Sequence, residues 1–167
     1  MLGRMTRSAV SATVLSPTNV RNVGDVEFRK KLTKVQFEVL REARTEPRGV
    51  TMAKGGFDDH FVANGEYLCA ACEAPLYTSA MKFECGCGWP GFWTNLKDAV
   101  CERPETDGSG RTEIVCASCS SHLGHLFRGE SFKNPAPNER HCVNSVSLQF
   151  RDSQGAITPC TYKGLVY

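Results

Sequence analysis

The stretches 65-GEYLCAAC-72 and 111-RTEIVCASC-119 decide the fold, because each is a short alternating segment that ends in a CxxC pair. The two-residue spacing lets both sulfurs of a pair face the same ion, and two pairs supply four thiolates for tetrahedral coordination of Zn²⁺. The pairs are 44 positions apart (116 − 72 = 44), which leaves room for a lobe of the domain between them. The predicted ligands of a structural metal site are Cys69, Cys72, Cys116 and Cys119.

A single CxxC pair is also typical of a thioredoxin-like redox site, and four sulfurs can hold iron. Two pairs favour a structural metal, with one zinc ion per chain as the main hypothesis and iron as the alternative. Because protein sulfurs would fill all four coordination positions, no water would remain on the metal. Any catalysis must therefore take place elsewhere in the chain.

Around the CxxC pairs, short alternating segments are separated by Gly, Pro, Asn, Asp and Ser. They predict antiparallel strands over 66–69, 112–116 and 141–150. The polar segments 103–111 and 133–139 are predicted loops. The pattern as a whole indicates one α+β domain in which strands dominate.

A helix is predicted to begin near Thr33, ahead of the strands. Thr33 and Gln36 have the spacing of a capping box, and Leu32 can pack onto Phe37 one turn into the helix. The helix is expected to end at Pro47, because the residue before a proline is pushed toward extended geometry. Its predicted apolar face comprises Val35, Val39, Leu40 and Ala43.

The composition is that of one globular domain: 167 residues, 41% hydrophobic and 23% charged. A net charge of +2 gives no basic surface of the kind that binds nucleic acids. No apolar run approaches the roughly 20 residues of a membrane-spanning helix. We therefore expect a soluble monomer with neither a nucleic-acid nor a membrane partner.

The nine cysteines are an odd number, so they cannot all be paired in disulfides. The apolar stretches near the start are short and broken by Ser, Thr and Arg, unlike a secretory signal. These features disfavour a secreted disulfide scaffold and favour metal binding plus catalysis in a reducing compartment.

The first residues, 1–24, have a composition of their own. They contain Arg4, Arg7 and Arg21, are rich in Ser and Thr, and have no acidic residue before Asp25. This composition is typical of an organellar transit peptide, and equally of a flexible tail without a special role. Two hypotheses for the location follow, mitochondrial and cytoplasmic. The folded domain is expected to occupy 25–167.

Among the remaining cysteines, Cys142 has the most suggestive surroundings. It lies in 140-RHCVN-144, where positive neighbours favour the thiolate, the form that attacks. His122 and His125 offer two imidazoles that can exchange protons near neutral pH. The alternative is a buried strand cysteine that only packs. A polar Asn144, predicted on the same strand face as Cys142, favours a built site, and Trp89 offers an aromatic wall.

At this point the chain resembles a known family, the B-type methionine sulfoxide reductases, which act on the R epimer of the sulfoxide. The segments that carry the resemblance occur in the family's order between residues 32 and 150. They are LTKVQFEVLREARTEP (32–47), GEYLCAACEAPLY (65–77), KFECGCGWPGF (82–92), RTEIVCASCSSHLGHLF (111–127) and RHCVNSVSLQF (140–150). The last three are the most specific.

The resemblance implies a role for each matching residue. The catalytic cysteine corresponds to Cys142 and a resolving cysteine to Cys87, with thioredoxin as the external reductant and oxidised proteins as substrates. Trp89 and Phe92 are expected to hold the substrate's terminal methyl group. The other expected catalytic residues are His122, His125, Asn144 and Arg140. The implied fold is mainly β, with two antiparallel sheets forming a barrel-like domain, short N-terminal helices and the four-cysteine zinc site.

The chain departs from the family at several positions. A common P-D-G turn is replaced by 128-RGE-130 and a longer loop, so Glu130 is the acidic residue there. Cys85 stands where relatives usually have serine, which leaves open whether Cys85 or Cys87 resolves. Gly91 replaces a commoner Ser or Ala. Cys101 and Cys160 have no assigned role, and an auxiliary thiol is the alternative interpretation of Cys160.

Two other classes of function compete with a reductase. A binding or chaperone module on the same scaffold would need the CxxC pairs but neither RHCVN nor HLGH. A nucleic-acid-binding zinc ribbon would need a basic stripe that the charge balance does not supply. The sequence therefore favours the reductase.

Overall fold

A computed structural model describes residues 25–167 of the chain. The segment Met1–Gly24, predicted as a flexible segment or transit peptide, lies outside the described residues, so the location stays a prediction. Among residues 25–167, no helix has both the length and the apolar character that crossing a membrane requires.

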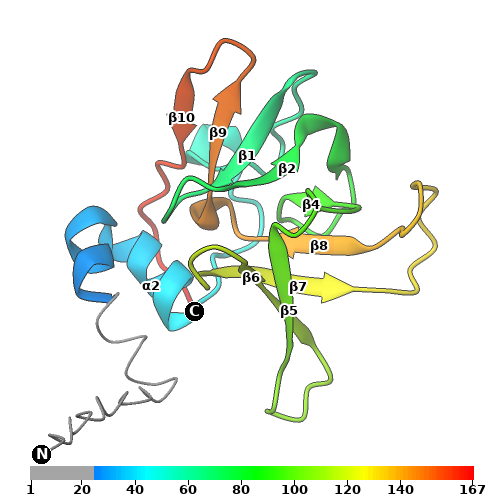
Figure 1. The fold of residues 1–167 in the computed structure, drawn as a ribbon, viewed down its shortest axis with the longest axis horizontal. Coiled ribbons are helices and arrows are strands. Elements are labelled where there is room, and N and C mark those ends of the chain that lie inside the picture. The colour runs from blue at the N-terminus through cyan, green and yellow to red at the C-terminus, as the bar shows by residue number, and fades with distance from the viewer. Residues whose placement is uncertain (1–24) are drawn as a thin grey trace, which may run out of the picture.

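Two antiparallel sheets make up most of the fold (Figure 1). One has four strands in the order β10-β9-β1-β2, and the other has six in the order β3-β4-β8-β7-β6-β5. Neither sheet closes on itself within the described residues, so the predicted barrel-like form is not what the structure has. The strands are β1 Gly65–Cys69, β2 Pro75–Thr78, β3 Lys82–Phe83, β4 Gly91–Phe92, β5 Val100–Pro104, β6 Thr112–Cys116, β7 His122–Phe127, β8 Arg140–Val143, β9 Leu148–Asp152 and β10 Ile157–Pro159.

The strands predicted over 66–69 and 112–116 are confirmed as β1 and β6. The single strand predicted over 141–150 is wrong. The chain leaves the six-stranded sheet after β8, makes a short 3-10 turn at Ser145–Ser147, and enters the other sheet as β9. The backbone N–H groups of Ser145 and Val146 both donate to the carboxylate of Glu46, about 100 positions away. The alternation of apolar and polar residues within 141–150 does not reveal that Glu46 is the partner of this turn, so the sequence predicted one continuous strand.

The predicted helix is present as α2, Lys34–Glu42. Thr33 caps it, and the capping box with Gln36 forms in both directions. The predicted end at Pro47 is wrong, because Ala43 takes the left-handed conformation (φ 55°) and ends the helix after Glu42. Short 3-10 turns at Met52–Lys54 (η1) and Ser79–Met81 (η2) complete the regular elements, and residues 25–31 are helical as well.

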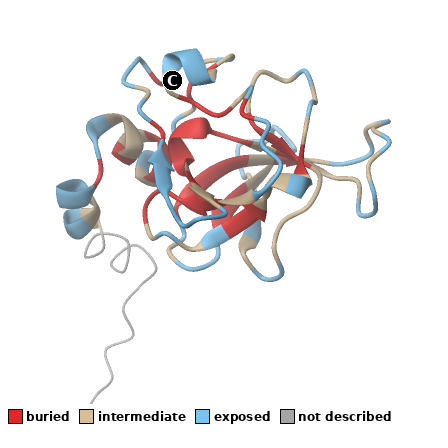
Figure 2. Cartoon of the chain, turned by 90° about the horizontal axis from the view of Figure 1, so that it is seen from above, coloured by how far each residue is buried: buried red, intermediate tan, exposed pale blue. Residues whose placement is uncertain are grey.

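The core lies between the two sheets and under α2, where Figure 2 shows the buried residues gathered along the strands. Tyr67 and Tyr77 of the four-stranded sheet and Phe92 of the six-stranded sheet are fully buried. The rings of Tyr77 and Phe92 stack at 4.1 Å between centroids, so aromatic contacts join one sheet to the other. The C-terminus lies beside α2 (Figure 1), where Thr45 and Tyr167 exchange two backbone hydrogen bonds.

The cap of α2 gives a direct test of this local structure. Thr33→Ala removes an exposed side-chain acceptor from the first turn, so we expect the free energy of unfolding to fall by about 1 kcal/mol. Thr33→Ser keeps the hydroxyl and should retain most of that stability. Urea unfolding of metal-loaded protein measures both variants, and equal losses would show that the hydroxyl is not the stabilising group.

Candidate active site and metal centre

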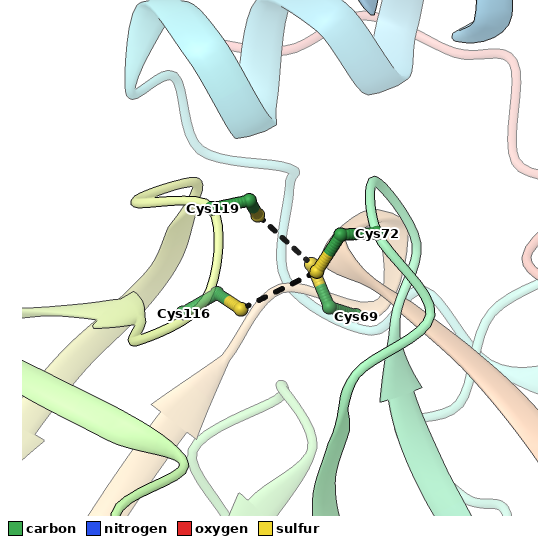
Figure 3. Close-up of side chains that lie close together, drawn as sticks. All are labelled: Cys69, Cys72, Cys116 and Cys119. Atoms are coloured by element: carbon green, nitrogen blue, oxygen red, sulfur yellow. Dashed lines mark hydrogen bonds between the residues drawn. The ribbon is translucent and has the colours of Figure 1, made fainter.

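The four predicted metal ligands meet where the two sheets meet. Cys69 ends β1 in the four-stranded sheet, and Cys116 ends β6 in the six-stranded sheet. Their sulfurs and those of Cys72 and Cys119 lie within 4.8 Å of one another (Figure 3). The Sγ–Sγ distances are 3.7 Å for Cys69–Cys119 and 3.6 Å for Cys72–Cys116. A tetrahedron of sulfurs about 2.3 Å from a zinc ion has an edge of about 3.8 Å, so the four residues fit such an ion.

The two CxxC pairs fold alike. The N–H of Glu73 donates to the carbonyl of Cys69 at 2.8 Å, and the N–H of Ser120 donates to the carbonyl of Cys116 at 2.8 Å. Both donors take the left-handed conformation, with φ of 65° for Glu73 and 58° for Ser120. Each pair is thus closed by the same turn, and the two turns bring their sulfurs face to face.

The four thiols share protons unevenly: hydrogen bonds with the other cysteines lower the pKa of Cys119, while the pKa values of Cys69 and Cys72 are raised. Protein groups alone raise the pKa of Cys69 and of Cys72 well above the ordinary value, first through hydrogen bonds with the other cysteines and then through burial. A bound metal ion reverses this effect, because its charge removes the proton from a coordinating thiol. A set of four sulfurs suits zinc or iron far better than magnesium or calcium.

A second group of predicted residues lines one cavity of about 170 Å³ next to β7 and β8. Cys142 lies on β8, directly opposite Gly91 of β4 on one side and His125 of β7 on the other. Opposed residues on antiparallel strands share a face of the sheet, so the His125 and Cys142 side chains lie together. The lining residues are Thr45, Trp89, Arg111, Gly124, His125, Phe127, Cys142 and Asn144.

Trp89 and Asn144 are held in place through one backbone unit, that of Glu46. Trp89 Nε1 donates to the Glu46 carbonyl at 3.1 Å, and the Glu46 N–H donates to Asn144 Oδ1 at 3.0 Å. Asn144 Nδ2 donates in turn to the carbonyl of Leu123 at 3.0 Å. The Asn144 amide is therefore fixed at both ends. Asn144 follows β8 directly, and it reaches the cavity through these bonds rather than through the strand alternation that the sequence suggested.

Glu46 was missed by sequence reasoning, although it is the most deeply placed acid near the cavity. It is 1% exposed, and its carboxylate accepts the N–H groups of Ser145 and Val146 at 2.7 and 2.9 Å. Burial raises its pKa to about 7, against the opposite effect of those two hydrogen bonds. The sequence carries one weak signal, an acid directly before a proline at the end of a predicted helix.

Three sulfurs lie in a chain beside the cavity. The thiol of Cys142 donates to Cys87 Sγ at 3.6 Å, and the thiol of Cys85 donates to the same atom at 2.7 Å. These two hydrogen bonds lower the pKa of Cys87 to about 2. The same hydrogen bonds, followed by burial, raise the pKa of Cys142 and of Cys85. Cys87 is thus the central sulfur of the three.

The two predicted histidines lie in different places. His125 lines the cavity, and its Nε2 is 3.0 Å from the carboxylate of Glu105, whose pKa this hydrogen bond lowers. His122 is 4% exposed and lines a separate cavity against α2. Its Nδ1 contacts Glu113 at 2.8 Å, while its buried Nε2 has no hydrogen-bond partner among the described residues. The centroids of the two imidazole rings are 5.6 Å apart. His122 therefore adjoins His125, but it does not line the cavity.

Arg140 lies two positions before Cys142 on β8 but does not line the cavity. Glu130 binds its guanidinium in a bidentate pair at 2.6 and 2.8 Å, so the acidic residue of the departing 128–130 segment is a structural partner. The guanidinium lies 4.1 Å from the centre of the Phe127 ring. Its positive charge lowers the pKa of each of the three clustered thiols, opposing the larger upward effects at Cys142 and Cys85.

The aromatic residues of the cavity differ from the predicted pair. Trp89 lines it, whereas Phe92 is fully buried against Tyr77 in the core and is not a lining residue. Phe127 lines the cavity with Trp89. Sequence reasoning missed Phe127 because its place depends on the pairing of β7 with β8.

The comparisons with known proteins agree with this geometry. The SelR domain model matches residues 32–152, which include every residue of the two sites. Peptide methionine sulfoxide reductase B5 of Arabidopsis thaliana is 45% identical over 130 residues, covering 78% of this chain and 88% of the relative. Peptide methionine sulfoxide reductase B9 of the same plant is 47% identical over 143 residues, 85% of this chain and 95% of the relative. The chain belongs to the peptide methionine sulfoxide reductase B family.

A third relative, peptide methionine sulfoxide reductase B5 of Oryza sativa, is 48% identical over 126 residues, which is 75% of this chain and 88% of the relative. The chain is thus an oxidoreductase of the peptide methionine sulfoxide reductase B family.

Two cysteines lie apart from both sites. Cys101 is exposed on β5, and Cys160 lies beyond the matched segment, where burial raises its pKa to about 12. Cys160 is buried and does not line the cavity, which disfavours an auxiliary role for it.

The buried Glu46 predicts a pH dependence of stability in this family member. Its folded pKa of about 7 lies above the ordinary value of 4.5 for an exposed glutamate, so over that interval the folded state binds more protons than the unfolded state. The free energy of unfolding should therefore fall as pH rises through this window, by up to about 3 kcal/mol at about 1.4 kcal/mol per pH unit.

Glu46→Gln is the matched variant, measured by urea unfolding at several pH values with metal present. It should be less stable throughout, because one of the two backbone N–H groups loses its acceptor. The part of the slope due to Glu46 should disappear from its curve. Parallel curves for the two proteins would show that Glu46 does not titrate in this range.

Proposed function

We propose that this chain reduces the R epimer of methionine sulfoxide in oxidised proteins to methionine, with Cys142 as the nucleophile. The observation that carries the proposal is the position of Cys142, which lines a cavity with Trp89 and His125 and has a second thiol 3.6 Å from its sulfur. Membership of the reductase family supports the same reaction. Specificity for the R epimer rests on the resemblance to the B-type enzymes.

The cavity suits one side chain. Its volume of about 170 Å³ is close to cavities of about 150 Å³ that accept a benzene-sized group. Trp89 and Phe127 supply apolar surface for the terminal methyl group of the substrate, while His125 and Asn144 supply polar groups for the sulfoxide oxygen. A methionine sulfoxide that protrudes from a protein surface presents this combination of one methyl group and one strong acceptor.

The first step transfers oxygen to Cys142. Loss of the Cys142 proton to solvent gives the attacking thiolate, whose charge Arg140 favours. The thiolate attacks the sulfoxide sulfur while the oxygen takes a proton, and we assign the proton donor to His125 because it is the cavity-lining histidine among the four of the chain. Methionine leaves reduced, and Cys142 is left oxidised as a sulfenic acid.

The second step regenerates the thiol. Cys87 attacks the sulfenic sulfur of Cys142, a disulfide forms, and water carries away the oxygen. An external dithiol then reduces the disulfide in two exchange steps, and we propose thioredoxin for this role on the strength of the resemblance. Glu46 acts as a positioning residue, because its backbone holds Trp89 and Asn144 and its carboxylate holds the turn after β8.

We further propose that the metal held by the four-cysteine site is zinc and that it is structural. Cys69, Cys72, Cys116 and Cys119 would hold it, and it would supply a rigid junction between the ends of β1 and β6. Four protein sulfurs saturate a tetrahedral ion, so no step of the reduction needs to pass through it.

The catalytic proposal predicts an epimer-specific, thiol-dependent reaction. With dithiothreitol and separated epimers of a methionine sulfoxide peptide, chromatography should detect methionine from R and essentially none from S. Cys142→Ser should lose activity by a factor of at least about 1,000, because serine is not ionised at neutral pH. Cys101→Ser is the matched control and should keep wild-type activity, since Cys101 is exposed on β5 away from the cavity. Turnover of the S epimer, or an active Cys142→Ser variant, contradicts the proposal.

The metal proposal predicts loss of zinc and of stability together in Cys116→Ser. Elemental analysis should find about one zinc per wild-type chain and far less in the variant. The melting temperature should fall by at least about 10 °C, because several kcal/mol of metal-binding energy contribute to folding. Cys101→Ser, on the adjoining strand, should retain both zinc and stability. A metal-free Cys116→Ser protein with an unchanged melting temperature would refute a structural role.

A further inference from the structure

The sulfur chain beside the cavity contains one thiol more than the two-step regeneration needs. Cys87 alone is within reach of Cys142 and suffices to resolve its sulfenic acid. Cys85 Sγ nevertheless touches Cys87 Sγ at 2.7 Å, a closer approach than that of Cys142. The central sulfur therefore has a partner on each side.

The position of Cys85 depends on a second departure from the family, at Gly91. A Cβ atom at Gly91 would lie 2.7 Å from Cys85 Sγ, closer than such atoms pack, and 3.3 Å from Cys85 Cβ, which is a tight contact. Gly91 is also the residue paired with Cys142 across β4 and β8. The two departures are thus one feature: a glycine opposite the nucleophile makes room for an additional sulfur beside Cys87.

The loop that carries the two cysteines is anchored around them. Arg48 donates from Nε to the carbonyl of Cys87 at 2.9 Å and from its terminal nitrogen to the carbonyl of Gly86 at 3.2 Å. Gly86 itself has a left-handed φ of 66°, and no atom outside its two chain neighbours lies within 4 Å of where its Cβ would be. The backbone between the two sulfurs is therefore glycine in open space, which allows the adjustment needed to close a short disulfide ring.

We propose that Cys85 is a second resolving cysteine, which attacks the Cys87–Cys142 disulfide at Cys87 and moves the disulfide to Cys85–Cys87. This inference rests on the proposed reduction at Cys142. In the exchange, the Cys85 thiolate forms a bond to Cys87 Sγ, the Cys87–Cys142 bond breaks, and Cys142 leaves as a thiolate. The cysteines as a group undergo no net oxidation or reduction, and the proton lost by Cys85 balances the one available to Cys142.

The consequence is that the nucleophile becomes free before any external reductant arrives. Cys142 is the most deeply buried of the three sulfurs, so a disulfide that excludes it is the more accessible one for a dithiol protein. The main cause that raises the pKa of Cys85 is its hydrogen bond to Cys87. That cause is removed once Cys87 is bound in a disulfide, while the charge of Arg140 remains.

The test counts methionine formed per enzyme without any reductant. Fully reduced, metal-loaded protein is mixed with excess R-sulfoxide peptide, quenched with acid, and analysed by chromatography. The relay predicts about two equivalents of methionine for the wild type, since Cys142 reacts, is released and reacts again. Cys85→Ser should give about one equivalent, with Cys87 and Cys142 linked. The matched control Cys101→Ser should give about two, as the wild type does.

Alkylation followed by peptide mass spectrometry identifies the linkage. After one equivalent of substrate, the relay predicts a Cys85–Cys87 disulfide and an alkylated Cys142 in the wild type. A single equivalent with a Cys87–Cys142 linkage overturns the relay but leaves the proposed reduction standing, whereas no methionine at all overturns the reduction itself. Two equivalents with a linkage to any other cysteine also overturn the relay.

A second variant tests the geometry without removing a thiol. Gly91→Ala places a methyl group against Cys85 Sγ, so the second equivalent should appear at least about tenfold more slowly than in the wild type. Combining it with Cys85→Ser separates this effect from any damage to β4. Any slowing of the first equivalent that is the same with and without Cys85 reflects damage to β4. If the Gly91→Ala single variant forms the second equivalent as fast as the wild type, the packing argument is wrong.

Discussion

The junction between two open sheets is the constraint on which the rest of the structure depends. Each sheet contributes one strand end to the four-sulfur cluster, β1 through Cys69 and β6 through Cys116. Cys119 lies three positions before the start of β7, and β7 carries both Gly124 and His125. Gly124 in turn allows β8 to approach, because a Cβ there would lie 1.9 Å from the Cys142 carbonyl oxygen. The four-cysteine cluster therefore fixes, one strand at a time, the position of Cys142, the proposed nucleophile.

Glu46 provides the second fixed point. Its carboxylate turns the chain out of one sheet and into the other at Ser145, while its backbone holds Asn144 and Trp89 on two sides of the cavity. Leaving a buried carboxylate without donors costs several kcal/mol, so the two backbone N–H groups that it accepts strongly favour this turn over a continuous strand. One residue thus determines both the end of β8, through its carboxylate, and the wall of the cavity, through its backbone. The raised pKa of Glu46 is the cost of placing an acid there.

Local patterns predicted what depends on neighbouring residues, and they failed where a distant partner decides. The cap at Thr33, the strands β1 and β6 and the metal ligands each follow from spacing within a few positions. The division of 141–150 between two sheets depends on Glu46, and the resemblance placed Phe92 at the cavity where the structure has Phe127. Likewise, HLGH contains two histidines of equal promise, and only strand pairing shows that His125 faces the cavity while His122 is held by Glu113. The assignment of catalytic roles remains a prediction, whereas the placement of the side chains is a structural result.

The pairing of Arg140 with Glu130 shows how the site balances charge against order. An unpaired guanidinium beside three thiols would lower their pKa values further, because its charge would be less compensated. Glu130 offsets part of that charge through a bidentate contact, which also fixes the guanidinium over Phe127. A side chain as flexible as arginine loses considerable entropy on taking this position, and the bidentate contact offsets that loss. The contact with Glu130 therefore weakens the effect of Arg140 on the pKa values of the three thiols, and it holds the guanidinium against the ring of Phe127, which lines the cavity.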